Sequence, residues 1–134
     1  MGTFRVDATL SHLQNRERSL TLDLLVDTGA TYTTLPREVA DALGLEPTDT
    51  RRIRFRDGRE ERWPVAAIFI RVDGQESPSF ALIGPPGGPA LLGKVTLEEL
   101  ALGVDPFARR LIPTMSYLVS PIVRGRFDSG EGDG

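Results

Sequence analysis

The chain contains no cysteine and only one histidine among its 134 residues. Without cysteine there is no disulfide, no thiolate nucleophile and no thiolate ligand for a metal. The histidine, His12, lies among polar residues of a predicted hairpin loop, and one imidazole cannot build an ordinary zinc site. A Ser-His-Asp triad would depend on the same His12, and no Gly-x-Ser-x-Gly motif is present. We therefore expect neither a metal site nor a histidine-based nucleophilic mechanism.

The chain also lacks a basic field and a long hydrophobic run. Its formal net charge is -3 and its pI is ≈ 5.2, so the positive charge that dominates nucleic-acid binding is missing. No segment approaches the roughly 20 apolar residues of a membrane span, and the first residues lack the apolar stretch of a signal peptide. We expect a cytoplasmic protein of one domain, with no nucleic-acid partner and no membrane partner.

The most informative stretch is an apolar run, residues 24–26, that ends at Asp27-Thr28-Gly29. Two leucines and a valine directly before an aspartate predict a buried strand that delivers a carboxylate to a tight turn. Burial of a carboxylate is costly unless the group is paired or used in chemistry. Ordinary turn chemistry explains Asp-Thr-Gly equally well, so the motif alone leaves both interpretations open.

The hydrophobic pattern predicts a mostly β fold. Alternation of apolar and polar residues indicates strands at 4–10 and 20–26, which form a hairpin that leads into Asp27. Further strands are predicted at 52–56, 59–63, 65–72 and 79–83, with a turn at Asp73-Gly74 between the last two, and a strand-turn-strand unit at 104–113. The glycine- and proline-rich segment 84–89 forbids regular structure.

An Asp-Gly pair at 57–58 lies between two strand-like runs, which is a strong hairpin signal. A two-residue turn would place Phe55 opposite Glu60. A three-residue turn would place Ile53 opposite Trp63, and this apolar match favours the longer loop.

Two short helices are predicted. The first spans 36–43, with a proline at its first position and a glycine directly after its end. The second spans 97–102, where Thr96 as N-cap and Glu99 at the third helical position form a capping box. Gly103 is expected to end this helix.

The order and spacing of these motifs over residues 4–113 resemble the retropepsin-like aspartic proteases, and bacterial members most closely. The resemblance is carried by the apolar strand that ends in Asp-Thr-Gly-Ala at 27–30, the hairpin at 57–58, the segment 81–85 and Leu-Leu-Gly at 91–93 before a helix. It implies a closed β-barrel, the half-lobe of an acid protease, with two short helices in a homodimer. Residues 1–113 would form the protease domain, 114–123 an apolar extended segment, and 124–134 a disordered acidic tail.

By this resemblance, Asp27 is the catalytic residue, Thr28 hydrogen-bonds across to its symmetry mate, and Gly29 lets two such loops approach. Two carboxylates held close cannot both ionise, so the pair shares one proton and supplies both a base and an acid. The base takes a proton from a water while the acid polarises the scissile carbonyl. This chemistry requires no cofactor.

The resemblance also assigns residues around the catalytic loop. The hairpin at 57–58 would be the flap over the substrate, and Leu92 and Gly93 would support the loop. The residues expected to bind substrate are Ala30, Asp57, Gly58 and Leu91.

These assignments favour an aspartic endopeptidase that acts on peptides or unfolded segments. The alternative is a dimeric module of the same fold that holds an extended peptide by β-pairing without cleaving it. A third interpretation is an unrelated small β-domain in which Asp27 only caps a turn. An Asp-Ser-Gly at 128–130 does not serve as a second catalytic loop, because no apolar strand precedes it.

The chain departs from the retroviral pattern in three places. Thr31 and Lys94 stand where an acidic residue and an arginine commonly form an ion pair near the dimer contact. The flap tip carries Arg56 and Arg59 in place of several glycines. These arginines suggest a preference for acidic or polar peptides, and a solvated charged hairpin is the simpler interpretation. The chain also continues past residue 113, where the resemblance ends. The segment 117–123 is expected to cross to a partner subunit or to occupy the cleft.

Overall fold

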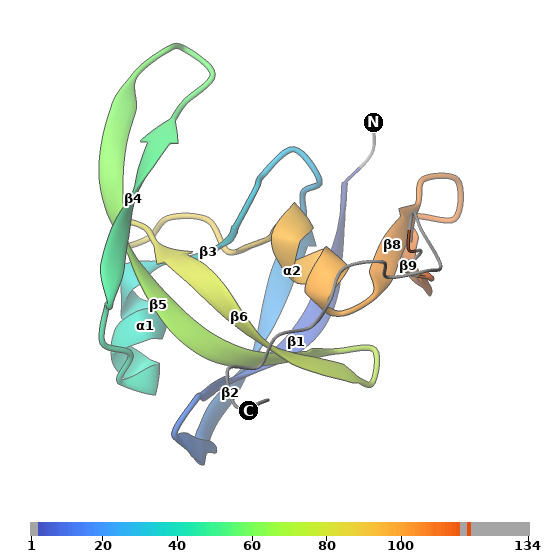
Figure 1. The fold of residues 1–134 in the computed structure, drawn as a ribbon, viewed down its shortest axis with the longest axis horizontal. Helices are drawn as coiled ribbons and strands as arrows, with labels where there is room; N and C mark the ends of the chain where they lie inside the picture. The colour runs from blue at the N-terminus through green and yellow to red at the C-terminus, as the bar shows by residue number, and fades with distance from the viewer. Residues whose placement is uncertain (1–2, 116–117, 119–134) are drawn as a thin grey trace, which may run out of the picture.

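The computed structural model describes residues 3–115 and residue 118 (Figure 1). Within this part of the chain, nine strands form a seven-stranded sheet and a separate two-stranded sheet, and two short helices are also present. The expectation of a mostly β fold with two short helices is therefore confirmed. Apart from 114, 115 and 118, the predicted segment 114–123 lies outside the described residues, and so does the whole tail 124–134.

The first hairpin is formed by strands β1 (Phe4–His12) and β2 (Asn15–Val26), which pair antiparallel as predicted. Alternate residues of both strands point into the core, and Leu10 and Leu24 are fully buried. Because β2 ends one residue before Asp27, the chain leaves the core at that carboxylate.

Strand β7 (Leu91–Leu92) lies between β2 and β3 (Thr33–Leu35). It pairs in parallel with β2 and antiparallel with β3, and β3 pairs in parallel with β6 (Gln75–Ile83). The loop 27–32 joins β2 to β3, so a strand from much later in the chain holds the two ends of this loop apart. This arrangement gives the loop a fixed frame on both sides.

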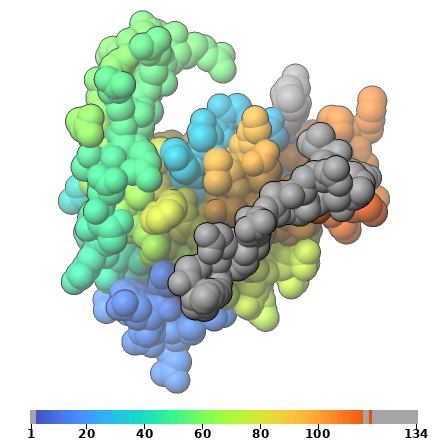
Figure 2. Space-filling view, in the orientation of Figure 1, coloured from blue at the N-terminus to red at the C-terminus, as the bar shows by residue number. Residues whose placement is uncertain are grey.

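The long hairpin is formed by β4 (Asp49–Arg54) and β5 (Glu60–Val72). Ile53 lies opposite Glu61 and not opposite Trp63, so both registers considered from the sequence are wrong. Figure 2 shows this hairpin projecting from the body of the molecule and curving over a hollow.

The turn of the long hairpin explains the error in register. The N–H of Phe55 donates to the carbonyl of Arg59 at 2.8 Å, and the N–H of Gly58 donates to the carbonyl of Phe55 at 2.9 Å. Gly58 has a φ of 94°, which favours glycine. Phe55 and Trp63 are not directly opposed in the strand pairing. Their rings instead meet edge to face along one face of the hairpin, with their centroids 5.8 Å apart.

Strand β5 is one continuous element, although the sequence predicted two strands on either side of Pro64. Pro64 lies opposite Thr50 of β4, and β6 pairs with β5 only from Val65 onward. A proline is tolerated there because the ladder toward β6 has not yet begun. The following turn has positive φ angles at Asp73 and Gly74, as the Asp-Gly signal indicated.

Both helices are present, but they begin differently from the prediction. Helix α1 (Arg37–Leu43) is preceded by Pro36, which is the extended N-cap with a ψ of 157° and not the first helical residue. Gly44 ends α1 in the left-handed conformation, with a φ of 69°. The start was displaced because β3 holds the chain extended up to the residue before Pro36.

Helix α2 (Lys94–Glu99) begins after Gly93, so the capping box predicted at Thr96 is wrong. Thr96 lies inside the helix and is fully buried, where its hydroxyl bonds to other side chains. The helix also ends before the predicted stop at Gly103, with Leu100 as its C-cap. Tertiary hydrogen bonding therefore outweighs the local capping signal.

Strand β1 pairs with β5 as well as with β2, so the pairings β1-β2-β7-β3-β6-β5 return to β1. Strands β8 (Leu102–Asp105) and β9 (Arg110–Pro113) form the predicted strand-turn-strand unit beside α2. Among the described residues, no helix is long and apolar enough to cross a membrane. The largest fully buried apolar side chains are Leu10, Leu24, Leu35, Leu43, Val65, Ile68, Ile70, Val72, Leu92 and Leu100.

Candidate active site

Asp27 is held by backbone contacts at the start of the loop 27–32. Its N–H donates to the carbonyl of Leu92 at 3.0 Å, and its own carbonyl accepts from the N–H of Ala30 at 3.1 Å. The carboxylate Oδ1 accepts from the N–H of Gly29 at 3.0 Å. The side chain is half-buried, and Thr28 and Gly29 are exposed. The carboxylate is therefore fixed in direction while one side stays open.

The start of α2 holds the second half of this loop. The N–H of Lys94 donates to the carbonyl of Ala30, and the N–H of Val95 donates to the carbonyl of Thr31, both at 2.9 Å. Gly93 lies so close to the chain that a Cβ there would be 2.3 Å from the carbonyl carbon of Tyr32. The loop and the helix can approach this closely only because residue 93 has no side chain.

A buried cluster of hydroxyls lies directly beneath the loop. The Thr33 hydroxyl donates to that of Thr96 at 2.6 Å, and Thr96 lies 2.8 Å from the Ser79 hydroxyl. Thr33 Oγ1 also accepts from the N–H of Gly93 at 3.1 Å. The cluster joins β3, β6 and α2, so every one of these hydroxyls has a partner in the core. Sequence reasoning missed it because the three residues are far apart in the chain.

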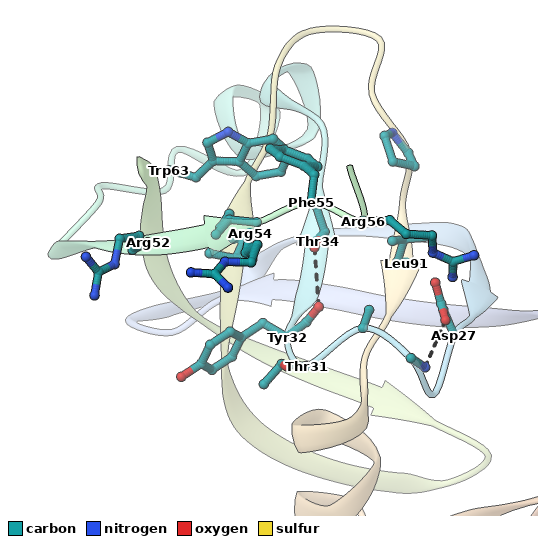
Figure 3. Close-up of a pocket in the computed structure, with 15 residues that line it drawn as sticks. Asp27, Thr31, Tyr32, Thr34, Arg52, Arg54, Phe55, Arg56, Trp63 and Leu91 are labelled. Atoms are coloured by element: carbon teal, nitrogen blue, oxygen red, sulfur yellow. Dashed lines mark hydrogen bonds between the residues drawn. The ribbon is translucent and has the colours of Figure 1, made fainter. Parts of the chain in front are cut away.

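A groove of about 480 Å³ opens beside Asp27, beneath the β4–β5 hairpin (Figure 3). Its floor is formed by the side of the loop 27–32, with Tyr32 and Leu91, and its upper wall carries Trp63. The Trp63 Nε1–H donates to Glu61 at 2.9 Å, which fixes the ring. The residues that line this groove are Asp27, Gly29, Ala30, Thr31, Tyr32, Thr34, Arg52, Ile53, Arg54, Phe55, Arg56, Trp63, Leu82, Pro89 and Leu91.

A second groove, of about 440 Å³, lies on the other side of the same carboxylate. Three residues line both grooves: Asp27, Gly29 and Arg56. The other residues of the second groove are Thr3, Phe4, Val26, Thr28 and Val104. Asp27 therefore stands on a ridge between two hollows, and among the described residues no other carboxylate lines either of them.

The residues assigned from the sequence fall into three groups. Ala30 and Leu91 line the first groove, and Thr28 lines the second. Leu92 is buried below the loop, where its carbonyl holds Asp27. The flap-tip residues at 57–58 are exposed and line neither groove.

The aromatic wall of the first groove was not assigned from the sequence. Tyr32, Phe55 and Trp63 line it although they come from separate elements. Alternation with Ile53 placed Phe55 on the apolar face of the hairpin, and this was the one available signal. Tyr32 gave none, because its side chain interacts with Arg51 of β4, and no local pattern connects these two segments.

Several charged groups of the hairpin shift one another's pKa. The backbone N–H of Arg59, followed by its guanidinium, lowers the pKa of Asp57. The side chain of Tyr32 and then Asp49 raise the pKa of Arg51.

Within residues 3–115 and 118, no group of three or more histidine, cysteine, aspartate or glutamate side chains could hold a metal ion.

Comparison with known proteins identifies a family. A family model described as "Aspartyl protease" matches residues 16–105, which include Asp27, all the lining residues of the first groove and the β4–β5 hairpin. No curated protein matches the chain. The chain belongs to a retropepsin-like bacterial aspartyl protease family.

Proposed function

We propose that the protein is an aspartic endopeptidase whose active site forms where the Asp27 loops of two identical subunits meet. The observation that carries this proposal is the position of Asp27 on a half-exposed ridge between two grooves, which contain no other carboxylate from the part of the chain that the structure describes. One carboxylate cannot supply both the base and the acid of this chemistry, whereas a two-fold axis beside Asp27 supplies the second. In that assembly each chain is one closed half-lobe.

The reaction follows from the shared proton. The ionised Asp27 takes a proton from a water, and the water oxygen bonds to the carbon of the scissile carbonyl. The protonated Asp27 of the second subunit hydrogen-bonds to the carbonyl oxygen and stabilises the tetrahedral intermediate. A proton then passes to the amide nitrogen, the C–N bond breaks, and the products are a carboxylic acid and an amine.

The neighbouring residues have positioning roles in this proposal. Thr28 is exposed on the second groove and would hydrogen-bond across the two-fold axis. Gly29 donates its N–H to Asp27 and leaves room for the second loop. The β4–β5 hairpin covers the first groove, with Ala30 and Leu91 at the base of the substrate cleft.

The second candidate is a dimeric module of the same fold that binds an extended peptide without cleaving it. It is favoured by one observation: β4 ends the seven-strand order, so its outer edge has no strand partner among the described residues. Such an edge pairs readily with an extended peptide. The intact Asp-Thr-Gly at 27–29, within the matched family region, favours the enzyme.

The test compares the wild type with Asp27→Asn on an unfolded protein substrate between about pH 4 and pH 7. Asp23→Asn is the matched control, because Asp23 is exposed on β2, the strand that leads to Asp27, and among the described residues its one ion pair is with Arg5 at 3.6 Å. We expect cleavage by the wild type and by Asp23→Asn, none by Asp27→Asn, and a dimer by size-exclusion chromatography with light scattering. Equal cleavage by the wild type and Asp27→Asn would refute the catalytic role.

A further inference from the structure

The β4–β5 hairpin carries an excess of positive charge. Residues 49–63 contain six arginines and four acidic residues, although the whole chain has a net charge of -3. The positive charge is therefore concentrated on the element that covers the first groove.

All four carboxylates of this hairpin are already used by three of its arginines. The ion pairs are Arg51 with Asp49 at 2.9 Å, Arg54 with Glu60 at 2.6 Å, and Arg59 with Asp57 and Glu61, both at 3.0 Å. Arg52, Arg56 and Arg62 form no ion pair with any residue that the structure describes. Three cations are left over on one hairpin.

Two of these remaining arginines belong to the lining of the grooves. Arg52 lines the first groove, and Arg56 lines both grooves. In Figure 3 the guanidinium of Arg56 extends toward Asp27, although the two groups form no ion pair. Because Asp27 is the only carboxylate among the described residues that line the first groove, the cations in this lining outnumber the acids.

The strand register adds an unfavourable contact. Arg52 lies directly opposite Arg62 in the β4–β5 pairing. Like charges at directly opposed positions destabilise a strand pair. A carboxylate bound at Arg52 would offset this repulsion. Binding of an anionic partner would therefore stabilise the β4–β5 strand pair.

The shape of the site specifies an extended partner. The outer edge of β4 has no strand partner among the described residues, and the groove runs beneath that strand. An extended peptide can pair with such an edge while its alternate side chains reach one row of guanidiniums. Arginine is well matched to carboxylates because its planar fork binds them through two parallel N–H groups.

We propose that Arg52 and Arg56 select extended peptide substrates with aspartate or glutamate side chains close to the scissile bond. This inference rests on the proposed function for the cleavage step, and its binding component stands independently of it. Each guanidinium–carboxylate contact in a partly exposed groove is worth about threefold in affinity, so two contacts give about tenfold.

The experiment uses the full chain and two fluorogenic peptides that are identical except for Glu or Gln at the positions that flank the cleavage site. We expect kcat/KM to be about tenfold higher for the Glu peptide at low salt and the ratio to fall at high salt. In the double variant Arg52→Gln, Arg56→Gln this ratio should fall to about one. Arg62→Gln is the control on the same hairpin: it removes one positive charge where the double variant removes two, but Arg62 lines neither groove, so this variant should keep the ratio.

Binding of both peptides to Asp27→Asn, measured by fluorescence anisotropy, separates this inference from the protease proposal. If the Glu peptide binds more tightly but the wild type cleaves neither peptide, the acidic selectivity stands and the protease proposal fails. Equal binding of the two peptides overturns the inference whether or not they are cleaved. A ratio reduced as much by Arg62→Gln as by the double variant also overturns it, because the effect would then be general charge and not contact.

Discussion

Gly93→Ala is the perturbation whose cost the structure defines best. A Cβ at residue 93 would lie 2.3 Å from the carbonyl carbon of Tyr32, 2.5 Å from its oxygen and 2.6 Å from the nitrogen of Thr33. These are backbone atoms, so relief requires the loop and α2 to separate by about 1 Å. That movement stretches three hydrogen bonds: from Gly93 to Thr33 Oγ1, from Lys94 to Ala30 and from Val95 to Thr31.

The expected loss of stability follows from these contacts. Overpacking costs roughly 1–3 kcal/mol. Each weakened hydrogen bond adds up to about 1 kcal/mol. We expect Gly93→Ala to lower the free energy of unfolding by about 3–5 kcal/mol, a large share of the total for a domain of this size. Urea unfolding, followed by circular dichroism at one fixed protein concentration, measures this loss.

Gly29→Ala is the matched control for this experiment. A Cβ at residue 29 would meet only the Asp27 Oδ1, at 3.3 Å, and the side chain can adjust. Because Gly29 is also where the second subunit's loop would approach, both variants are compared at a protein concentration low enough to keep the chain monomeric, where we expect Gly29→Ala to stay within about 1 kcal/mol of the wild type. A Gly93→Ala protein as stable as Gly29→Ala would refute the claim that close backbone approach fixes the catalytic loop.

Three further predictions concern the surroundings of the site. Thr33→Val removes the hydroxyl that bonds to Thr96 and should cost about 2 kcal/mol in urea unfolding, so unchanged stability would contradict the role of the cluster. The N–H of Gly87 lowers the pKa of Glu38 from its ordinary value of 4.5, so this contact stabilises the fold above that value and loses its effect as the pH falls through the lowered pKa. Glu38→Gln should therefore reduce stability at pH 7 more than at pH 3, and an equal reduction at both would contradict the assignment. Trp63 is the only tryptophan, so saturating Asp27→Asn with peptide should shift its fluorescence, and unchanged emission would argue against binding in the first groove.

The sequence predicted those parts of the fold that local patterns determine. Period-two alternation identified both strands of the first hairpin, and Asp-Gly pairs identified two turns. The position of Asp27 was predictable because a run of three buried or half-buried aliphatic residues ends there. Each of these features depends on residues that are neighbours in the chain.

The features that the sequence did not predict depend on tertiary contacts. Thr96 was expected to cap a helix, but its hydroxyl bonds to Thr33, which is 63 residues away. The register of the long hairpin is set by its turn and by the edge-to-face contact of Phe55 with Trp63, whereas the prediction assumed that apolar residues face each other directly. Local signals were present in both cases, but the long-range contacts were stronger.

For the candidate site, the sequence indicated which segments take part, but not the shape of the surface around Asp27. The catalytic loop, the supporting Leu92 and Gly93, and the covering hairpin were all assigned from motifs. Asp27 was expected behind a buried strand, and the structure places it half-buried on a ridge between two grooves. That exposure is a property of the folded surface, so no residue pattern could indicate it.

The central claim is that one active site requires the Asp27 carboxylates of two chains. Its most direct test is to refold the wild type together with an equal amount of Asp27→Asn, so that the subunits mix at random, and to measure peptide cleavage. If both carboxylates are required, only the pairs of two wild-type chains are active, and the activity falls to about one quarter of that of the wild type alone at the same total concentration. Activity of about one half would contradict the account, because each chain would then work on its own.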